Sequence, residues 1–246
     1  MSDRDGYPTT QEIEQLKIYC GHLRTKNTKL DIDSFIDSLV ELLKEIWHYP
    51  DYIAGNGRYF ELHTGGWSGN EEIINVLSES MFWLMYWRKS EWGGHYYFEL
   101  PSDGTKTLYV AGPIDGVTPE WATEWRRKVR DTLTGWTVLD PTEGKDLYAA
   151  GVNDTLYTAE EIVKADLAMV EQADVLLVDW RNVPINRTDG YRDPLRVGTI
   201  CEVKHAHDHG KRIIAFGNLR RGYWIRYHVG EWYGTLDGAL EKLGED

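Results

Sequence analysis

The sequence has 246 residues, a formal net charge of -13 and hydrophobic residues at 41% of its positions. This is enough for one large domain or two small ones with packed cores. The acidic balance argues against a nucleic-acid-binding surface, although it is compatible with a small local anion pocket. Apolar runs fall short of the roughly 18 residues that span a bilayer, so we expect no membrane segment.

The cysteines and the amino-terminal residues indicate the cellular compartment in which the protein is expected. Cys20 and Cys201, the two cysteines, are far apart in the sequence. They form neither a disulfide framework nor a zinc pattern, and they suit a reducing cytoplasm. The first five residues, Met-Ser-Asp-Arg-Asp, do not have the character of a signal peptide. We therefore expect a soluble, cytoplasmic protein.

The first hundred residues predict a compact α+β unit. Residues 17–20 are expected to form a short strand. Over Asp31–Trp47, apolar residues recur at three- and four-residue steps, which predicts an amphipathic helix. Further strands are expected at Arg58–His63 and His95–Leu100. A long helix is expected between them, ending at Gly93-Gly94.

The segment Gly65-Gly66-Trp67-Ser68-Gly69 leads into that long helix, and Ser68 or Asn70 is available to cap it. Two interpretations stand side by side. The backbone amides of the segment could cradle an anion or a sugar at the helix N-terminus. Alternatively, the segment is a glycine-rich turn, which we favour because glycines are common before helices.

A boundary is expected at Pro101–Lys106, which carries Pro, Gly and polar residues and separates two different patterns. We therefore expect an N-terminal α+β domain of unknown role over residues 1–101. An α/β domain is expected over residues 107–246.

In the second domain, strand-like and helix-like segments alternate. Helices are expected after Thr118-Pro119, after the capping box Thr158–Glu161, and over Gly198–His209 and Leu236–Leu243. The irregular segment 142–157 is expected to cover a site as a lid. Strands are expected at Leu108–Ala111, Trp136–Leu139, Asp174–Asp179 and Arg212–Phe216. This alternation predicts a doubly wound, flavodoxin-like parallel sheet with right-handed crossovers.

Ligands of such sheets bind outside the carboxyl ends of the strands. The apolar run that begins at Leu108 stops abruptly at Gly112-Pro113. Polar side chains are expected near this point from Asp115, Asp140 and Asp179, and from the start of the last crossover helix. Neither a Gly-x-Gly-x-x-Gly nor a Walker sequence is present, which argues against dinucleotide and nucleoside-triphosphate folds of those types.

Three histidines, His205, His207 and His209, lie close together in the sequence. Alternate residues of a helix do not share a face. We therefore interpret them as surface residues and predict no metal site.

Two segments of the second domain carry a resemblance to a known family. One is the strand and turn Tyr109-Val-Ala-Gly112-Pro113. The other is Gly198-Thr-Ile-Cys-Glu202, a helix start with a carboxylate on its first turns. Together with Asp166, which precedes the third strand, they resemble the nucleoside 2-deoxyribosyltransferase family, including its nucleotide N-hydrolase branch. The resemblance covers about residues 107–217.

The resemblance implies that Glu202 attacks the anomeric carbon of a sugar and forms a glycosyl-enzyme intermediate. Such a carboxylate can trap the oxocarbenium-like transition state of N-glycoside cleavage. By the same resemblance, Asp166 protonates or positions the base, Tyr109 holds the nucleophile by a hydrogen bond, and Gly112 lets the backbone approach the ligand. Further substrate contacts are expected from Pro113, Ile114, Asp115, Asp179, Arg196, Gly198 and Thr199.

The chain departs from the family pattern at two positions. Six residues before the glutamate, the transferases carry an acidic residue and the hydrolases a phosphate-binding serine, but this chain has Arg196. An arginine there could pair with a 5′-phosphate, which favours a nucleoside monophosphate as substrate. Pro113 stands where the hydrolases have a small polar residue.

We therefore expect an enzyme that cleaves or transfers at the N-glycosidic bond of a (deoxy)nucleoside or its 5′-monophosphate. Its partner is a small molecule, not a nucleic acid or a membrane, and no metal or organic cofactor is needed. Acceptor choice depends on water exclusion, so transferase and hydrolase both stay open. The resemblance also implies a homo-oligomer, a dimer or larger. Two other hypotheses are a non-catalytic nucleotide-binding sensor and a glycohydrolase that cleaves a nicotinamide dinucleotide.

Overall fold

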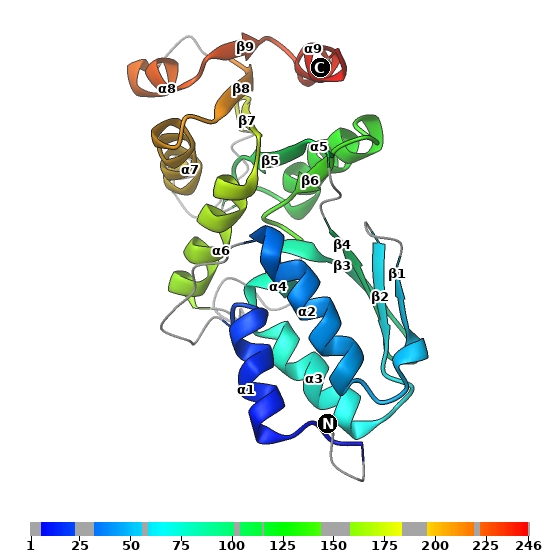
Figure 1. Ribbon diagram of the computed structural model, residues 1–246. Helices are drawn as coiled ribbons and strands as arrows, with labels where there is room; N and C mark the ends of the chain where they lie inside the picture. The colour runs from blue at the N-terminus through cyan, green and yellow to red at the C-terminus, as the bar shows by residue number, and fades with distance from the viewer. Residues whose placement is uncertain are drawn as a thin grey trace. The chain divides into compact units, whose positions relative to one another are not determined.

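The computed structural model describes residues 6–22, 32–55, 59–100, 104–114, 116–143, 158–183, 196–218 and 222–245, with the backbone alone over 32–36. The chain forms two compact units, Met1–Ser102 and Asp103–Asp246 (Figure 1). Among the described helices, none is long and apolar enough to cross a bilayer.

The first unit combines helices with a four-stranded antiparallel sheet in the order β1-β2-β4-β3. The helices lie on one side of this sheet (Figure 1). The elements are α1 (Thr10–Tyr19), α2 (Ile32–Ile46), the 3-10 turn η1 (Pro50–Tyr52), β1 (Ile53–Gly55), β2 (Tyr59–His63), α3 (Ser68–Ser78), α4 (Met81–Tyr86), β3 (Trp87–Glu91) and β4 (His95–Glu99). The predicted helix over Asp31–Trp47 and the predicted strands that correspond to β2 and β4 are confirmed.

The strand predicted at residues 17–20 is wrong, because these residues belong to the end of helix α1 and its C-cap. A capping box begins this helix: the Thr9 hydroxyl accepts from the backbone N–H of Glu12, and the Glu12 carboxylate accepts from the backbone N–H of Thr9. Ile13 and Leu16 are buried beneath the helix. The capping box was legible in the sequence and outweighs the strand-like character of four residues.

The single long helix predicted up to Gly93-Gly94 is also wrong, because the chain breaks it at Ser80. The Ser80 hydroxyl accepts from the backbone N–H of Trp83 at 3.2 Å and so caps a separate, shorter helix, α4. After α4, the chain extends into β3 and returns through Gly93-Gly94, both at positive φ, as β4. Pairing with β4 therefore overrides the helical spacing of the aromatic residues.

The glycine-rich segment at 65–69 forms a turn, with Gly65 and Gly66 at φ values of 60° and 77°. The predicted caps are wrong: the N-cap of α3 is Trp67, which makes no side-chain cap bond. Asn70 is instead wholly buried and bonds to the backbone of His48, accepting from its N–H at 2.9 Å. The Asn70 side chain therefore links α3 to His48, just before η1.

The second unit is an α/β domain with a five-stranded, wholly parallel sheet in the order β6-β5-β7-β8-β9, which confirms the predicted doubly wound fold. Its elements are β5 (Thr107–Ala111), α5 (Pro119–Thr132), β6 (Thr137–Leu139), α6 (Ala159–Gln172), β7 (Val175–Trp180), α7 (Val197–Asp208), β8 (Arg212–Gly217), α8 (Tyr223–His228), β9 (Glu231–Tyr233) and α9 (Leu236–Gly244). The strand β9, three residues long, was not predicted.

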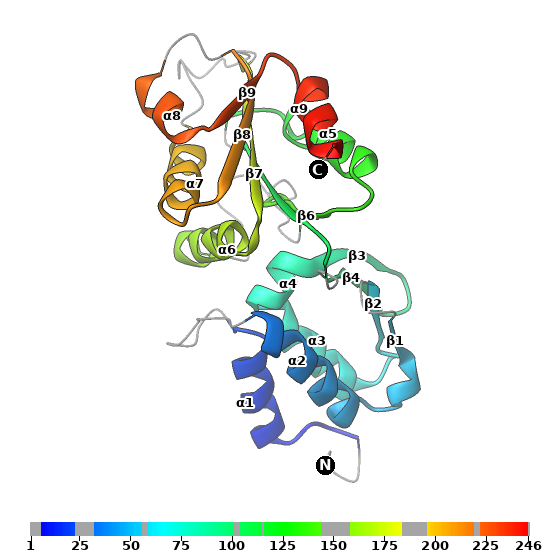
Figure 2. The ribbon, with the colours of Figure 1, turned by 45° about the horizontal axis from the view of Figure 1, so that its top comes forward.

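Helices cover both faces of this sheet. Figure 2 shows α6 and α7 on one face and α5 and α9 on the other. Side chains alternate along β5: Leu108 and Val110 pack in the core with Trp125 and Val129 of α5. Tyr109, between them, points to the opposite face, toward α7.

The two cysteines should differ sharply in reactivity. Cys20 is wholly buried, and burial raises the pKa of its thiol to about 12, whereas Cys201 is exposed on α7. Because the thiolate is the reactive form, we expect Cys201 alone to react rapidly with a chromogenic disulfide reagent at about pH 8. Cys201→Ser should abolish this reaction, and Cys20 should react only after denaturation. Two rapidly reacting thiols in the native protein would contradict the buried position of Cys20.

Candidate active site

The chain places β5 and β7 side by side at the point where the strand order reverses. From β5 the chain first crosses to β6 on one side, and it then returns past β5 to β7 on the other. Such a switch point, outside the carboxyl ends of the strands, is where doubly wound sheets bind ligands. In this chain, Gly112 and Asp179 lie at this edge.

Tyr109 and Glu202 meet across the layer between the sheet and α7. The Tyr109 hydroxyl donates a hydrogen bond of 2.7 Å to Oε1 of Glu202. Tyr109 is wholly buried, and Glu202 is 8% exposed. The contact predicted from the resemblance is therefore present, between residues that are 93 positions apart in the chain.

Burial and the neighbouring carboxylates keep Tyr109 protonated. Burial raises the pKa of its phenol well above the ordinary value, and the charges of Glu202 and Asp166 raise it further, while Arg126 lowers it. Asp166 is half-buried on α6, and its charge acts on the Tyr109 phenol together with that of Glu202. A neutral tyrosine can only donate its proton to the carboxylate, which holds Glu202 in one orientation.

Arg126 of α5 was not predicted as part of this region, yet its side chain is wholly buried. Nη2 donates to the backbone oxygen of Gly112 at 3.1 Å, and Nε lies 3.3 Å from Oδ1 of Asp140. The guanidinium thus fixes the turn that follows β5. From the sequence alone, Arg126 has the character of a solvated helix residue. The local pattern therefore could not identify it as a buried residue of this region.

Asp140 and Asp179, both expected near the ligand, are paired within the protein. Asp140 accepts from Thr142, N–H at 2.9 Å and hydroxyl at 2.7 Å, and lies close to Arg126. Asp179 is wholly buried and receives two bonds from the Arg181 guanidinium, at 2.9 and 2.8 Å. These bonds give both carboxylates a structural role, and the contact of Asp179 with a substrate stays a prediction.

Gly112 lies in tight packing, where any side chain would push against its neighbours. A Cβ added there would stand 3.0 Å from Cβ of Asp179 and 3.0 Å from Cζ2 of Trp125. Close packing of β5 against β7 and α5 is therefore sufficient reason for a glycine at this position. Its predicted approach to a ligand is a separate proposal.

Arg196 precedes α7 and is tied to the end of β7. Nη1 donates to the backbone oxygen of Asp179 at 2.7 Å, Nη2 donates to that of Arg181, and the guanidinium stacks 4.6 Å from the ring centroid of Trp180. These contacts set where α7 begins. On the first turn of α7, Thr199 is buried, whereas Gly198 is exposed, and a Cβ added to it would meet no heavy atom within 4 Å.

The remaining predicted site residues are placed only in part. Pro113 is buried and Ile114 half-buried directly after β5. Asp115 lies outside the described residues, and so does the predicted lid beyond Glu143 up to residue 157. The chain between residues 183 and 196, which leads to α7, likewise lies outside them.

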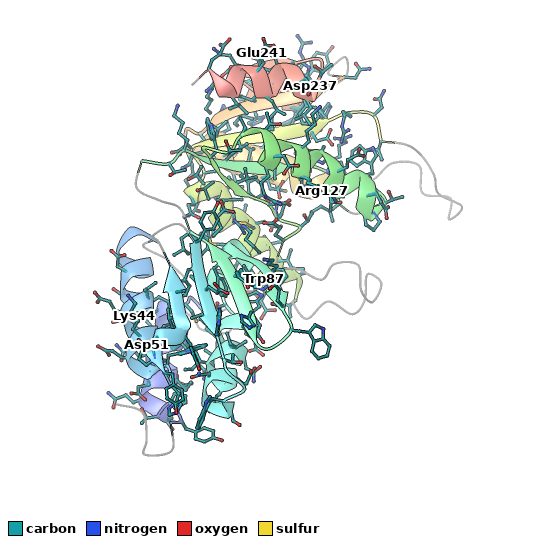
Figure 3. All side chains as sticks on the ribbon, turned by 90° about the vertical axis from the view of Figure 1, so that its right-hand side faces the viewer. Lys44, Asp51, Trp87, Arg127, Asp237 and Glu241 are labelled. Carbon is teal, nitrogen blue, oxygen red and sulfur yellow. The ribbon has the colours of Figure 1, made fainter. Side chains whose placement is uncertain are left out.

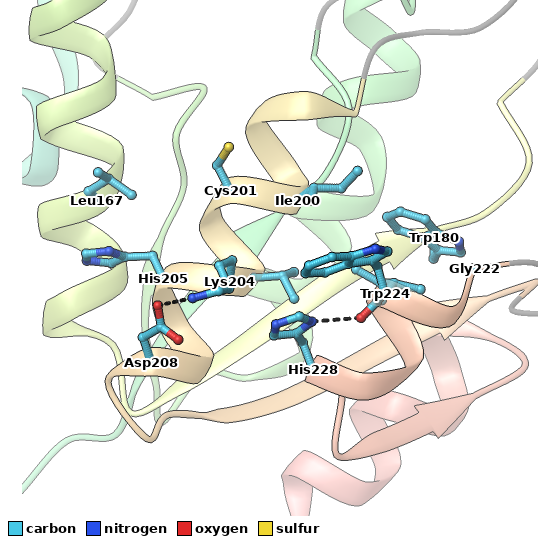
Figure 4. Close-up of a pocket in the computed structure, with 12 residues that line it drawn as sticks. Leu167, Trp180, Ile200, Cys201, Lys204, His205, Asp208, Gly222, Trp224 and His228 are labelled. Atoms are coloured by element: carbon cyan, nitrogen blue, oxygen red, sulfur yellow. Dashed lines mark hydrogen bonds and ion pairs between the residues drawn. The ribbon is translucent and has the colours of Figure 1, made fainter.

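A pocket of about 430 Å³ opens on the other side of α7, between α6 and α8 (Figure 4). Ile200, Cys201 and Trp224 are among its mainly apolar lining, and neither Tyr109 nor Glu202 is among its described lining residues. Tyr223 and Trp224 of α8 are largely exposed here. This pocket is therefore separate from the Tyr109–Glu202 contact. The homo-oligomer predicted from the sequence stays a prediction.

The three histidines lie at the surface as interpreted, with His207 and His209 exposed and His205 half-buried, but one step of the interpretation was wrong. His205 of α7 and His209, the C-cap of that helix, are four residues apart, and their ring centroids lie 4.2 Å apart. Nε2 of His205 lies 3.0 Å from the carboxylate of Glu171 on α6, and the three side chains could hold a metal ion. His207 points elsewhere, toward Tyr227 and His228 of α8. The alternate-residue argument was right for His207 but overlooked the pair at i and i+4.

Comparisons with known proteins give likeness in structure only. No family model matches the chain, and no curated protein matches it in sequence. Among solved structures, a conserved protein of Enterococcus faecalis is 15% identical over 58% of this chain and 99% of its own, with a TM-score of 0.42. A CMP N-glycosidase of Clostridium botulinum is 19% identical over 56% and 98%, with a TM-score of 0.38. A 2-deoxyribosyltransferase of Bacillus psychrosaccharolyticus is 18% identical over 55% and 90%, with a TM-score of 0.39.

Gly112→Ala should destabilise the second unit, because the new methyl group meets Asp179 and Trp125 at 3.0 Å. We expect a loss of about 1–3 kcal/mol in the free energy of unfolding, measured by urea denaturation. Gly135→Ala is the matched control, since a Cβ at Gly135 meets nothing within 4 Å and its φ is not positive. Equal effects of the two substitutions would contradict the close packing at Gly112.

Proposed function

We propose that this protein is an enzyme that cleaves or transfers at the N-glycosidic bond of a nucleoside or its 5′-monophosphate, with Glu202 as nucleophile. The hydrogen bond of 2.7 Å from Tyr109 to Glu202 carries the proposal. A buried carboxylate, oriented by a protonated tyrosine and placed beside the switch point of a doubly wound sheet, suits attack on a sugar carbon. The sequence resemblance supports the same role.

In the first step, a carboxylate oxygen of Glu202 bonds to C1′ of the sugar as the bond from C1′ to the base nitrogen breaks. The base leaves with the bonding electron pair and takes up a proton, for which Asp166 is the proposed donor. Tyr109 keeps its proton throughout, because its pKa is raised well above the ordinary value by burial. Its hydrogen bond holds the carboxylate in the orientation for attack.

In the second step, an acceptor attacks C1′ of the glycosyl ester and Glu202 leaves as a carboxylate. If the acceptor is water, which gives up a proton, the product is a free sugar and the enzyme is a hydrolase. If it is a second base, the enzyme is a transferase. Asp166 is the proposed group that receives the acceptor's proton, which restores the starting state.

Substitutions of the central pair test this mechanism. Glu202→Gln should lower turnover of the best substrate in a panel of nucleosides and monophosphates by at least about 1,000-fold, because an amide cannot form the ester. Tyr109→Phe should lower it by about 10- to 150-fold, the loss of one hydrogen bond to a charged group. Release of free base is measured by chromatography.

Glu241→Gln is the control, since Glu241 is exposed on α9 (Figure 3) and should leave turnover unchanged. A second free base in the assay separates the two acceptors, because only a transferase then makes a new nucleoside. Ligand binding without turnover, unaffected by Glu202→Gln, would instead favour the nucleotide sensor. Release of nicotinamide from the dinucleotide would favour the glycohydrolase.

Arg196→Lys distinguishes a structural role for Arg196, at the end of β7, from a contact with a 5′-phosphate. Both of its terminal nitrogens donate to backbone oxygens at the end of β7, so we expect kcat/KM to fall by a similar factor for a nucleoside and for its monophosphate. A loss confined to the monophosphate would establish the phosphate contact that the sequence suggests. Steady-state kinetics on one matched nucleoside and monophosphate pair suffices.

A further inference from the structure

In the first unit, three side chains with metal-binding atoms converge on the sheet. Nε2 of His63 lies 2.5 Å from Oε1 of Glu61 and 3.2 Å from Nδ1 of His95, and that Nδ1 lies 3.7 Å from the same Oε1. All three side chains are about a third exposed, with values of 30%, 27% and 33% for His63, Glu61 and His95. Solvent therefore reaches the point where they meet.

Strand pairing sets this convergence. His63 of β2 lies directly opposite His95 of β4, and Glu61 is two residues before His63, on the same face. The backbone around the pair is held on both sides: Trp47 donates to the backbone oxygen of His63 at 3.1 Å, and Thr64 donates its N–H to Gly94 at 2.9 Å. The positions of the two imidazoles therefore come from the sheet and do not depend on a mobile loop.

Gly94, directly before His95, allows the close turn that leads into β4. Gly94 has a φ of 77°, and a Cβ there would stand 2.0 Å from the Thr64 hydroxyl oxygen. A glycine is required for the chain to turn so close to β2 and to enter β4 at His95. The short approach between the strands is thus built into the backbone.

Each of the three converging atoms can act as a metal ligand. A neutral imidazole carries a proton on one nitrogen and a lone pair on the other, and a carboxylate oxygen carries lone pairs. Nε2 of His63 lies within hydrogen-bond distance of both Oε1 of Glu61 and Nδ1 of His95, and the donor in each contact depends on the tautomer of the ring. In the tautomers that place the proton of each ring on its other nitrogen, all three atoms present lone pairs to one centre, where a divalent cation would take the place of the proton.

We propose that Glu61, His63 and His95 bind a divalent transition-metal ion, with Zn²⁺ as the best fit. In a tetrahedral zinc site with bonds of 2.0–2.1 Å, neighbouring ligand atoms stand about 3.3 Å apart. The two imidazole nitrogens already lie at 3.2 Å. The Glu61 oxygen, now 2.5 Å from Nε2 of His63, would need to move back by about 0.8 Å.

Two histidines and one carboxylate leave the fourth tetrahedral position to water. This is the ligand count of an open zinc site, in which three protein groups hold the ion and solvent or a ligand completes it. The proposal gives the first unit a binding role that is independent of Glu202. It does not depend on the proposed N-glycosidic activity.

The second convergent group, Glu171, His205 and His209, provides a comparison within the same chain. Its residues lie on two helices of the second unit, and Glu171 and His209 are more exposed than any member of the first group, with side-chain values of 52% and 44%. Freedom to move costs affinity, since more conformational entropy is lost when the ion is bound. We therefore place the tighter site on the sheet.

Calorimetric titration of the full chain with ZnCl₂, after removal of metal by a chelator and dialysis, tests the proposal. We expect one tight equivalent in the wild type. In His63→Ala/His95→Ala its affinity should fall by more than about 100-fold, because even the loss of an outer hydrogen-bonding partner costs 10- to 100-fold. In the matched control, His205→Ala/His209→Ala, the tight equivalent should persist.

Glu61→Gln keeps the size of the side chain and removes its charge, so it tests the site should the double alanine variant fail to fold. We expect zinc affinity to fall by about 10-fold or more, and the urea unfolding transition shows that the variant is folded. Three outcomes would overturn the proposal. They are wild-type affinity in Glu61→Gln or in a folded His63→Ala/His95→Ala variant, loss of the tight equivalent in the His205 and His209 control, and no tight binding by the wild type.

Discussion

The hydrogen bond from Tyr109 to Glu202 joins the middle of the parallel sheet to helix α7. A carboxylate that is only 8% exposed has lost most of its hydration, and bonds from protein donors must replace it. A wholly buried tyrosine on β5 can meet that need only if α7 packs directly over the strand. The position of α7 and the orientation of its carboxylate are therefore parts of the same constraint.

Charged groups on the two faces of the sheet have different partners. On the α5 side, Asp140 lies against the buried Arg126 and Asp179 is held by Arg181, so these carboxylates stabilise the turns after the strands. On the opposite side, Glu202 and Asp166 surround Tyr109 and raise the pKa of its phenol. The acidic side chains at the strand ends were the plainest signal in the sequence, yet Glu202 and Asp166, the carboxylates proposed for catalysis, lie on helices.

In the first unit, the proposed metal site depends on cross-strand register. His63 and His95 are separated by α3, α4 and β3 in the chain, but they are direct partners in the sheet. The helical spacing after Ser68 is interrupted at Ser80, after which β3 and β4 form a hairpin that leads to His95. A uniform helix up to Gly93, as the sequence predicted, would leave β4 without β3 and would alter the path of the chain to His95.

The sequence by itself determined the elements that local rules specify: the capped helices α5 and α6, the amphipathic helix α2, and the apolar strands whose alternation with helices predicts a parallel sheet. Tyr109 and Glu202 were identified by resemblance and not by periodicity. Only the tertiary structure decided the break at Ser80, the burial of Arg126, the addition of β9 and the meeting of His63 with His95. Caps and periodicity act within a few residues, whereas these features depend on pairing and packing between distant segments, for which a local pattern contains no signal.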